Sequence, residues 1–190
     1  MTISGKIRKF EEKYCEALLS QLEADIATLS KNERGEIFVF ALVIDYSGRG
    51  GVDDSSVRCG YNTFSNLALQ EEERQSDEHL WNLDSFLQPE FLFDTFCENH
   101  KALASFYASQ HDVRISDKDI NEQEEIDRLW EICTVAIAKW KHTSSFKQLL
   151  PSCKNIILTN GVGQGAVATE RVNGPMPDKF LIGGGFYPGE

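Results

Sequence analysis

The chain has 190 residues, a formal net charge of −11, and 41% hydrophobic and 11% aromatic residues. This much apolar surface excludes a disordered chain, and the length predicts one globular domain. The longest apolar run, residues 37–44, is too short for a membrane-spanning helix, and no apolar segment of a signal peptide follows the N-terminus. We therefore expect a cytoplasmic protein.

The acidic side chains are concentrated in one part of the sequence. Residues 71–131 contain seventeen Asp and Glu against five Lys and Arg, whereas the rest of the chain is close to neutral. A region of one sign repels nucleic acid and anionic membranes and attracts a basic protein. Neither nucleic acid nor membrane is therefore expected as a partner. Solvated helix surfaces would account for the same charges without any partner.

The first half of the chain predicts a helix followed by two strands. Apolar residues repeat at intervals of three and four over residues 7–29, which predicts an amphipathic helix of about six turns, and residues 31–35 are expected to form the turn that ends it. The uninterrupted apolar residues 37–44 predict a strand buried on both faces, and residues 55–62 a neighbouring antiparallel strand. Thr63 is placed to cap a helix that begins at Phe64.

The second half predicts two longer helices. Pro89 occupies the first position of one, which extends to Tyr107, and residues 116–119 resemble a capping box that opens the other. Residues 155–159 predict a second short central strand. From about residue 160 the chain is rich in Gly and Pro and predicts turns, with residues 180–182 as the best candidate for a strand.

The order of these elements predicts a single α+β (α/β) domain over residues 1–190. Its central sheet is expected to be mixed or antiparallel, and to be flanked by the long N-terminal helix and further helices.

Patterns that carry catalysis or bind metals are weak. Five Cys lie far apart without a CxxC pair, which argues against a zinc site and a disulfide framework. Cys97 and His100 are one helical turn apart and could act as a thiol hydrolase pair. No orienting third group accompanies them, so packing of Cys97 among aromatic residues, with His100 reaching solvent, is favoured.

A glycine-rich segment, Gly-Val-Gly-Gln-Gly at residues 161–165, follows an apolar run and could cradle the phosphate of a nucleotide. It lacks the Lys-Ser/Thr pair of a phosphate loop, and residues 170–175 are expected to break a following helix. A flexible loop is therefore favoured. No cofactor, metal or catalytic residue is expected.

Two segments in the first 70 residues resemble a known family. The sequence GEIFVFALVID at residues 35–45, preceded by the amphipathic helix, and YNTFSNL at residues 61–67 resemble a bacterial family called domain of unknown function 4303. Members of that family are often encoded beside polymorphic toxins, so the resemblance implies an immunity protein that neutralises a cognate toxin domain. It implies no catalytic residues.

An immunity protein with this charge would occlude a basic toxin, with a nuclease as one expected activity. The expected contact residues are Glu71, Glu72, Glu73, Asp77, Glu78, Trp81, Asp117, Asp119, Glu122, Glu124 and Glu125. Trp81 and Trp130 are the expected aromatic anchors. The charges from residue 117 to residue 127 also have a local explanation, because carboxylates stabilise the start of a helix. A small enzyme and a structural subunit of a larger assembly are the alternatives.

Overall fold

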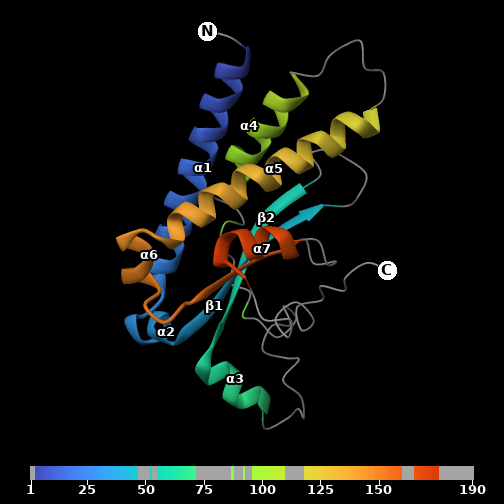
Figure 1. Cartoon of the computed structure of the whole chain (residues 1–190). Helices are drawn as coiled ribbons and strands as arrows, with labels where there is room; N and C mark the ends of the chain where they lie inside the picture. Colours follow the sequence, from blue (N-terminus) through green and yellow to red (C-terminus); the bar gives the residue numbers. More distant parts are fainter. Residues whose placement is uncertain are drawn as a thin grey trace, which may run out of the picture.

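The computed structural model describes residues 3–46, 52, 55–71, 87, 92, 96–109, 118–159 and 165–175. Its elements in chain order are α1 (Ile3–Thr28), α2 (Lys31–Glu36), β1 (Ile37–Tyr46), β2 (Ser55–Thr63), α3 (Phe64–Glu71), α4 (Cys97–Ala108), α5 (Lys118–Lys141), α6 (Ser144–Leu149), β3 (Asn155–Thr159) and α7 (Ala166–Asn173). Together they make the predicted α+β domain, with helices packed against one mixed sheet (Figure 1).

The described sheet has the strand order β2-β1-β3. β1 pairs with β2 in antiparallel register, from Ile37 opposite Thr63 to Tyr46 opposite Ser55, and with β3 in parallel register. The central strand and its antiparallel neighbour are therefore confirmed. The prediction that residues 155–159 form a central strand is wrong, because β3 pairs only with β1 among the described strands and so lies at an edge.

β1 is buried on both faces, as its continuous apolar sequence predicts. Phe40, Leu42 and Ile44 face the helices and belong to the main hydrophobic core. Val39 and Ala41 alternate with them along the strand and are also fully buried. On the helix side, Phe40 contacts Trp140 of α5 with 6.1 Å between ring centroids, which places the C-terminal half of α5 over the centre of the sheet.

α1 and α5 are the two longest helices, and they run parallel to each other. The hydrogen bonds between them join residues separated by 117 positions in sequence: Glu11 with Arg128, Cys15 with Ile132, and Glu23 with Trp140. A constant offset means that the two helices keep one register over more than three turns. α4 packs beside α1, which completes a layer of helices over the sheet (Figure 1).

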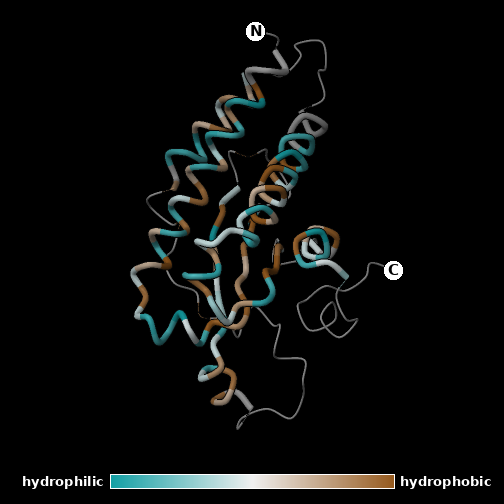
Figure 2. Tube along the Cα trace, turned by 60° about the vertical axis from the view of Figure 1, so that its left-hand side comes forward, coloured by the Kyte–Doolittle hydropathy of each residue, from teal (hydrophilic) through white to brown (hydrophobic). Residues whose placement is uncertain are grey.

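The apolar stripes of both long helices lie where the sequence periodicity predicts. Tyr14, Leu18, Leu22 and Ile26 of α1 are buried at intervals of four residues. Figure 2 shows apolar and polar residues alternating along these helices, as expected for helices that cover a core. None of the helices in the described part of the chain combines the length and the hydrophobicity needed to cross a membrane.

Three local predictions are wrong, and each has a physical reason. Residues 31–36 form α2, not a turn, because Ser30 caps a short helix by accepting a hydrogen bond from Glu33 N at 3.2 Å. The helix expected from Pro89 begins only at Cys97, since Leu92 has a φ of 66°, which ends any right-handed helix. The third error concerns α7, which occupies part of the segment expected to consist of turns.

Candidate functional site

Most of the predicted contact residues cannot be placed. Six of them lie outside the described residues: Glu72, Glu73, Asp77, Glu78, Trp81 and Asp117. Glu71 is the last residue of α3, and Asp119 and Glu122 belong to the first turns of α5, but the structure does not describe their side chains. The predicted strand at residues 180–182 also lies outside the described residues.

Glu124 and Glu125 are the predicted contact residues whose side chains are described, and they point in different directions. Glu124 is exposed, whereas Glu125 is buried and its Oε2 accepts a hydrogen bond from the backbone N–H of Val52 at 3.1 Å. Glu125 is therefore not available as a surface charge. Helical periodicity gives the signal, because Glu125 precedes the buried Leu129 by four residues.

Trp130 does not act as an exposed anchor either. Its side chain is partly buried and packs against the main core, and its buried Nε1 has no hydrogen-bond partner in the described part of the chain. The expected pair of aromatic anchors near the acidic residues therefore loses one member, and the other, Trp81, lies outside the described residues.

His100 is buried and does not reach solvent, contrary to the prediction from sequence. Its Nδ1 lies 3.0 Å from the Tyr14 hydroxyl, and its Nε2 lies 2.8 Å from Ser55 Oγ and 3.1 Å from the Val52 carbonyl oxygen. The imidazole thus joins α1, the start of β2 and α4. The Cys97 side chain is not described, so the predicted thiol–imidazole pair is not tested.

The order Ser55, His100, Tyr14 resembles a nucleophile, a base and an orienting group, but its hydrogen bonds indicate a structural role. The Ser55 hydroxyl donates to the Val52 carbonyl at 2.8 Å, and the tautomer that satisfies both Val52 and Ser55 carries its proton on Nε2. That nitrogen then cannot accept the Ser55 proton. Burial raises the pKa of Tyr14 well above its ordinary value, so Tyr14 remains a phenol and donates to Nδ1.

The four cysteines with described side chains are held as thiols. Burial raises the pKa of Cys15 to about 11, with the nearby Glu11 carboxylate acting in the same direction, and raises that of Cys153 to about 12. The pKa values of Cys59 and Cys133 are raised by burial as well. Because the thiolate is the nucleophile, these four groups are poorly suited to catalysis at neutral pH.

A groove of about 390 Å³ lies between α1 and α5. Its lining residues are Arg8, Glu11, Glu12, Cys15, Glu16, Leu19, Arg128, Glu131, Ile132, Val135, Ala136 and Lys139. Arg128 Nε and Nη2 each donate to the Glu11 carboxylate at 2.6 Å, and the Tyr107 hydroxyl donates to the same carboxylate at 3.0 Å. This network joins α1, α4 and α5 at one point.

The Glu11 network perturbs both of its donors. Hydrogen bonding to Glu11 raises the pKa of Arg128, and burial together with the Glu11 charge raises the pKa of Tyr107. These residues were not predicted from the sequence. A signal was present, because Glu11 lies three, seven and eleven residues before Tyr14, Leu18 and Leu22, on the buried stripe of α1.

The glycine-rich segment leads into a helix, which the sequence analysis did not predict. Residues 160–164 lie outside the described residues, but Gly165 caps α7 with a φ of 129°. A Cβ at Gly165 would lie 2.0 Å from the Leu158 carbonyl oxygen. Close packing of α7 on β3 therefore explains this glycine, and Thr169 secures the contact by accepting a hydrogen bond from Leu158 N at 2.9 Å.

Within the described ranges, no three His, Cys, Asp or Glu side chains are grouped as metal ligands. Comparisons with protein-family models, with curated proteins and with solved structures find no match. The resemblance of the first 70 residues to the domain of unknown function 4303 family therefore stays a prediction from sequence.

Proposed function

We propose that the chain is a cytoplasmic immunity protein that binds a basic toxin domain and blocks its activity by stoichiometric occlusion. The observation that carries the proposal is exposed acidic charge on α5. Glu124 and Asp127 are both exposed, and neither forms an ion pair with a residue that the structure describes. Asp127 accepts a hydrogen bond from the neutral Gln123 side chain at 2.8 Å, which leaves its charge unbalanced by that contact. Arg128 follows them directly, but both of its donating nitrogens bind Glu11.

This arrangement favours docking because no basic side chain in the described part of the chain neutralises these two carboxylates. The same sign extends through the sequence at residues 71–78, where five acidic residues accompany one arginine. Complementary charge raises the rate at which a basic partner associates, by up to about 1,000-fold in strong cases. An immunity protein benefits from rapid association because its toxin is harmful while unbound.

The alternatives receive less support from the described residues. A thiol hydrolase built on Cys97 is not tested, because the Cys97 side chain lies outside the described residues. The other four cysteines are held as thiols, and His100 has both ring nitrogens engaged in the core. A structural subunit predicts a stable complex that leaves the toxicity of the partner unchanged. Neutralisation is therefore the property that distinguishes an immunity protein from a structural subunit.

The test combines growth and binding. If the gene beside this chain encodes a large secreted protein, the probe is the C-terminal domain of that protein, expressed in a host with and without the chain. We expect the domain to stop growth, the chain to restore it, and the purified pair to form a 1:1 complex. A domain that stays toxic in the presence of the folded chain contradicts the proposal.

A matched pair of variants tests the role of charge. Glu124→Lys with Asp127→Lys is expected to lower the association rate constant at least tenfold at low salt, because both exposed carboxylates become basic. Glu16→Lys with Glu170→Lys makes the same change of net charge at exposed sites elsewhere and is expected to change the rate less than threefold. Equal effects of the two pairs would show that only the total charge matters.

A further inference from the structure

Large apolar side chains are exposed mainly at one end of the sheet. Among the described residues, those with high exposure are Phe64 at 53%, Leu69 at 67%, Leu87 at 40% and Val167 at 80%. The first two belong to α3, and Leu87 forms an isolated bridge with Tyr61 of β2, three residues before α3 begins. Val167 lies apart from them on α7.

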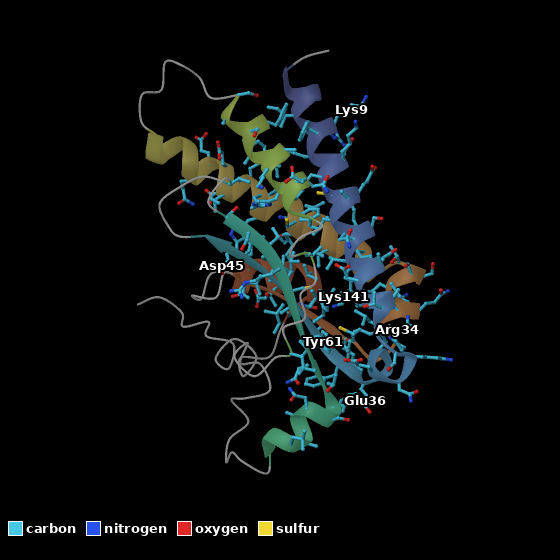
Figure 3. All side chains as sticks on the ribbon, turned by 180° about the vertical axis from the view of Figure 1, so that it is seen from behind. Lys9, Arg34, Glu36, Asp45, Tyr61 and Lys141 are labelled. Carbon is cyan, nitrogen blue, oxygen red and sulfur yellow. The ribbon has the colours of Figure 1, made fainter. Side chains whose placement is uncertain are left out.

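α3 is held firmly by its first turn. The Thr63 hydroxyl accepts a hydrogen bond from Asn66 N at 3.1 Å, which confirms the predicted cap, and Asn66 Nδ2 donates to Asn62 Oδ1 at 2.8 Å. The Ser65 hydroxyl donates to Glu36, which Figure 3 shows at the end of the sheet beside α3. The helix therefore has a fixed direction, and it extends away from the helical layer (Figure 1).

Phe64 is exposed but not free to move. Its ring stacks on that of Phe38 of β1 with 5.1 Å between centroids, while about half of its surface faces solvent. Leu69 and Ala68 are exposed further along the same helix. A partner that covers these side chains removes apolar surface from water. Because the helix and the Phe64 ring are already held in place, binding costs little conformational entropy, and both properties are typical of a binding hot spot.

The charge of the chain indicates what kind of partner covers this face. The sequence that continues from α3 contains Glu71, Glu72, Glu73, Asp77 and Glu78 against Arg74. These charges disfavour a second copy of the same chain and an anionic lipid surface, because both carry the same sign. A basic protein with an apolar pocket satisfies both the exposed side chains and the neighbouring charge.

We propose that the α3 face formed by Phe64, Ala68 and Leu69 is the apolar anchor on which the basic toxin domain docks. This inference rests on the proposed immunity function and adds the contact surface to it. Acidic residues set the rate of association, whereas the α3 face sets the lifetime of the complex, because short-range apolar contacts act only after the two surfaces meet.

The decisive experiment compares Leu69→Ser with Val167→Ser. Both changes replace an exposed apolar side chain by a hydroxyl, and only the first lies on α3. Binding of the toxin domain named above is measured by surface plasmon resonance. We expect Leu69→Ser to raise the dissociation rate constant at least tenfold with an association rate constant within threefold of wild type, and Val167→Ser to change neither by more than twofold. Unfolding of each variant by heat verifies that the fold is intact.

The outcomes separate the two proposals. Tight binding of wild type with equal dissociation from Leu69→Ser and Val167→Ser refutes the α3 anchor and leaves the immunity function standing. Absence of binding and of growth rescue by wild type refutes both. Sedimentation of the chain alone measures whether it forms a dimer. A wild-type dimer that is lost in Leu69→Ser would show that a second copy of the chain covers α3, and this result would overturn the assignment of that face to the toxin.

Discussion

Replacing Arg128 by Met is expected to destabilise the fold by about 3 kcal/mol. The Glu11 side chain is only 5% exposed, and it accepts two hydrogen bonds of 2.6 Å from Arg128 and one of 3.0 Å from Tyr107. Without Arg128 the buried carboxylate keeps, among the described residues, one neutral donor and no ion-pair partner. Removing one member of a buried pair costs about 3–5 kcal/mol, and the lower end applies because Arg128 itself is 49% exposed, so water reaches this side of the network.

Urea unfolding followed by circular dichroism measures this loss directly. For a chain of this size, 3 kcal/mol corresponds to a fall in melting temperature of roughly 6–12 °C. Arg8→Met is the matched control, because Arg8 also pairs with a glutamate of α1, Glu12, but both side chains of that pair are exposed. Its expected cost is below about 1 kcal/mol.

A double variant separates charge from packing. Glu11→Leu combined with Arg128→Met removes both charges, so the cost is expected to fall below that of Arg128→Met alone, although the Tyr107 hydroxyl loses its acceptor. Equal destabilisation of the chain by Arg128→Met and Arg8→Met would contradict a stabilising role of the buried ion pair. That result would mean that solvent already screens Glu11.

Three further predictions concern stability. Gly165→Ala is expected to lower the free energy of unfolding by roughly 1–3 kcal/mol or more, because a φ of 129° and the nearby Leu158 carbonyl oppose a side chain. Gly35 of α2 has open space around it, so Gly35→Ala is expected to leave this free energy unchanged or to raise it in the same assay. Burial in the folded chain raises the pKa of Cys15 to about 11, so the folded chain holds this proton more tightly than the unfolded chain, and the free energy of unfolding is expected to fall as pH rises from about 9 through 11. Cys15→Ala is expected to show a weaker pH dependence of the free energy of unfolding. An unchanged pH dependence would contradict the assignment to Cys15. His100→Ala is expected to lower the free energy of unfolding by about 2–4 kcal/mol and to leave toxin binding by the folded fraction unchanged. Loss of toxin binding with wild-type stability would instead indicate a functional role for His100.

The sequence predicts the long elements well because their patterns are repeated many times. α1 and α5 show their apolar stripes over several turns, and β1 is marked by an unbroken apolar run that is rich in β-branched and aromatic residues. The Thr63 cap is a local interaction, so it too can be recognised without tertiary contacts. These features depend on residues that are neighbours in sequence.

The errors occur where distant residues decide the local structure. Leu92 has the spacing of a helical residue, yet its φ is positive and its N–H donates to Asp25 of α1 at 3.1 Å. α7 contains an Asn and is flanked by glycines, and Asn173 stabilises it by donating to the Ile156 carbonyl of β3 at 2.7 Å. Spacing alone indicates a helix around Leu92, and composition alone indicates turns around α7. Both predictions are wrong because the deciding contacts come from other elements.

The candidate site shows the same division. The concentration of acidic residues can be read from the sequence, but the sequence analysis did not separate Glu124, which faces solvent, from Glu125, which binds Val52. The exposed α3 face was missed because Phe64 and Leu69 resemble ordinary core residues, and only their exposure in the folded structure distinguishes them.

The parallel pairing of α1 with α5 has a consequence for synthesis of the chain on the ribosome. Because their hydrogen bonds join residues 117 positions apart, the apolar stripe of α1 leaves the ribosome long before its partner exists, by roughly 6–23 s at usual elongation rates. The edge of β1 that pairs with β3 likewise has no partner until β3 has been synthesised. Nascent chains of this protein thus expose the apolar stripe of α1 and one unpaired edge of β1 until residue 159 has emerged, and exposed surfaces of this kind favour aggregation.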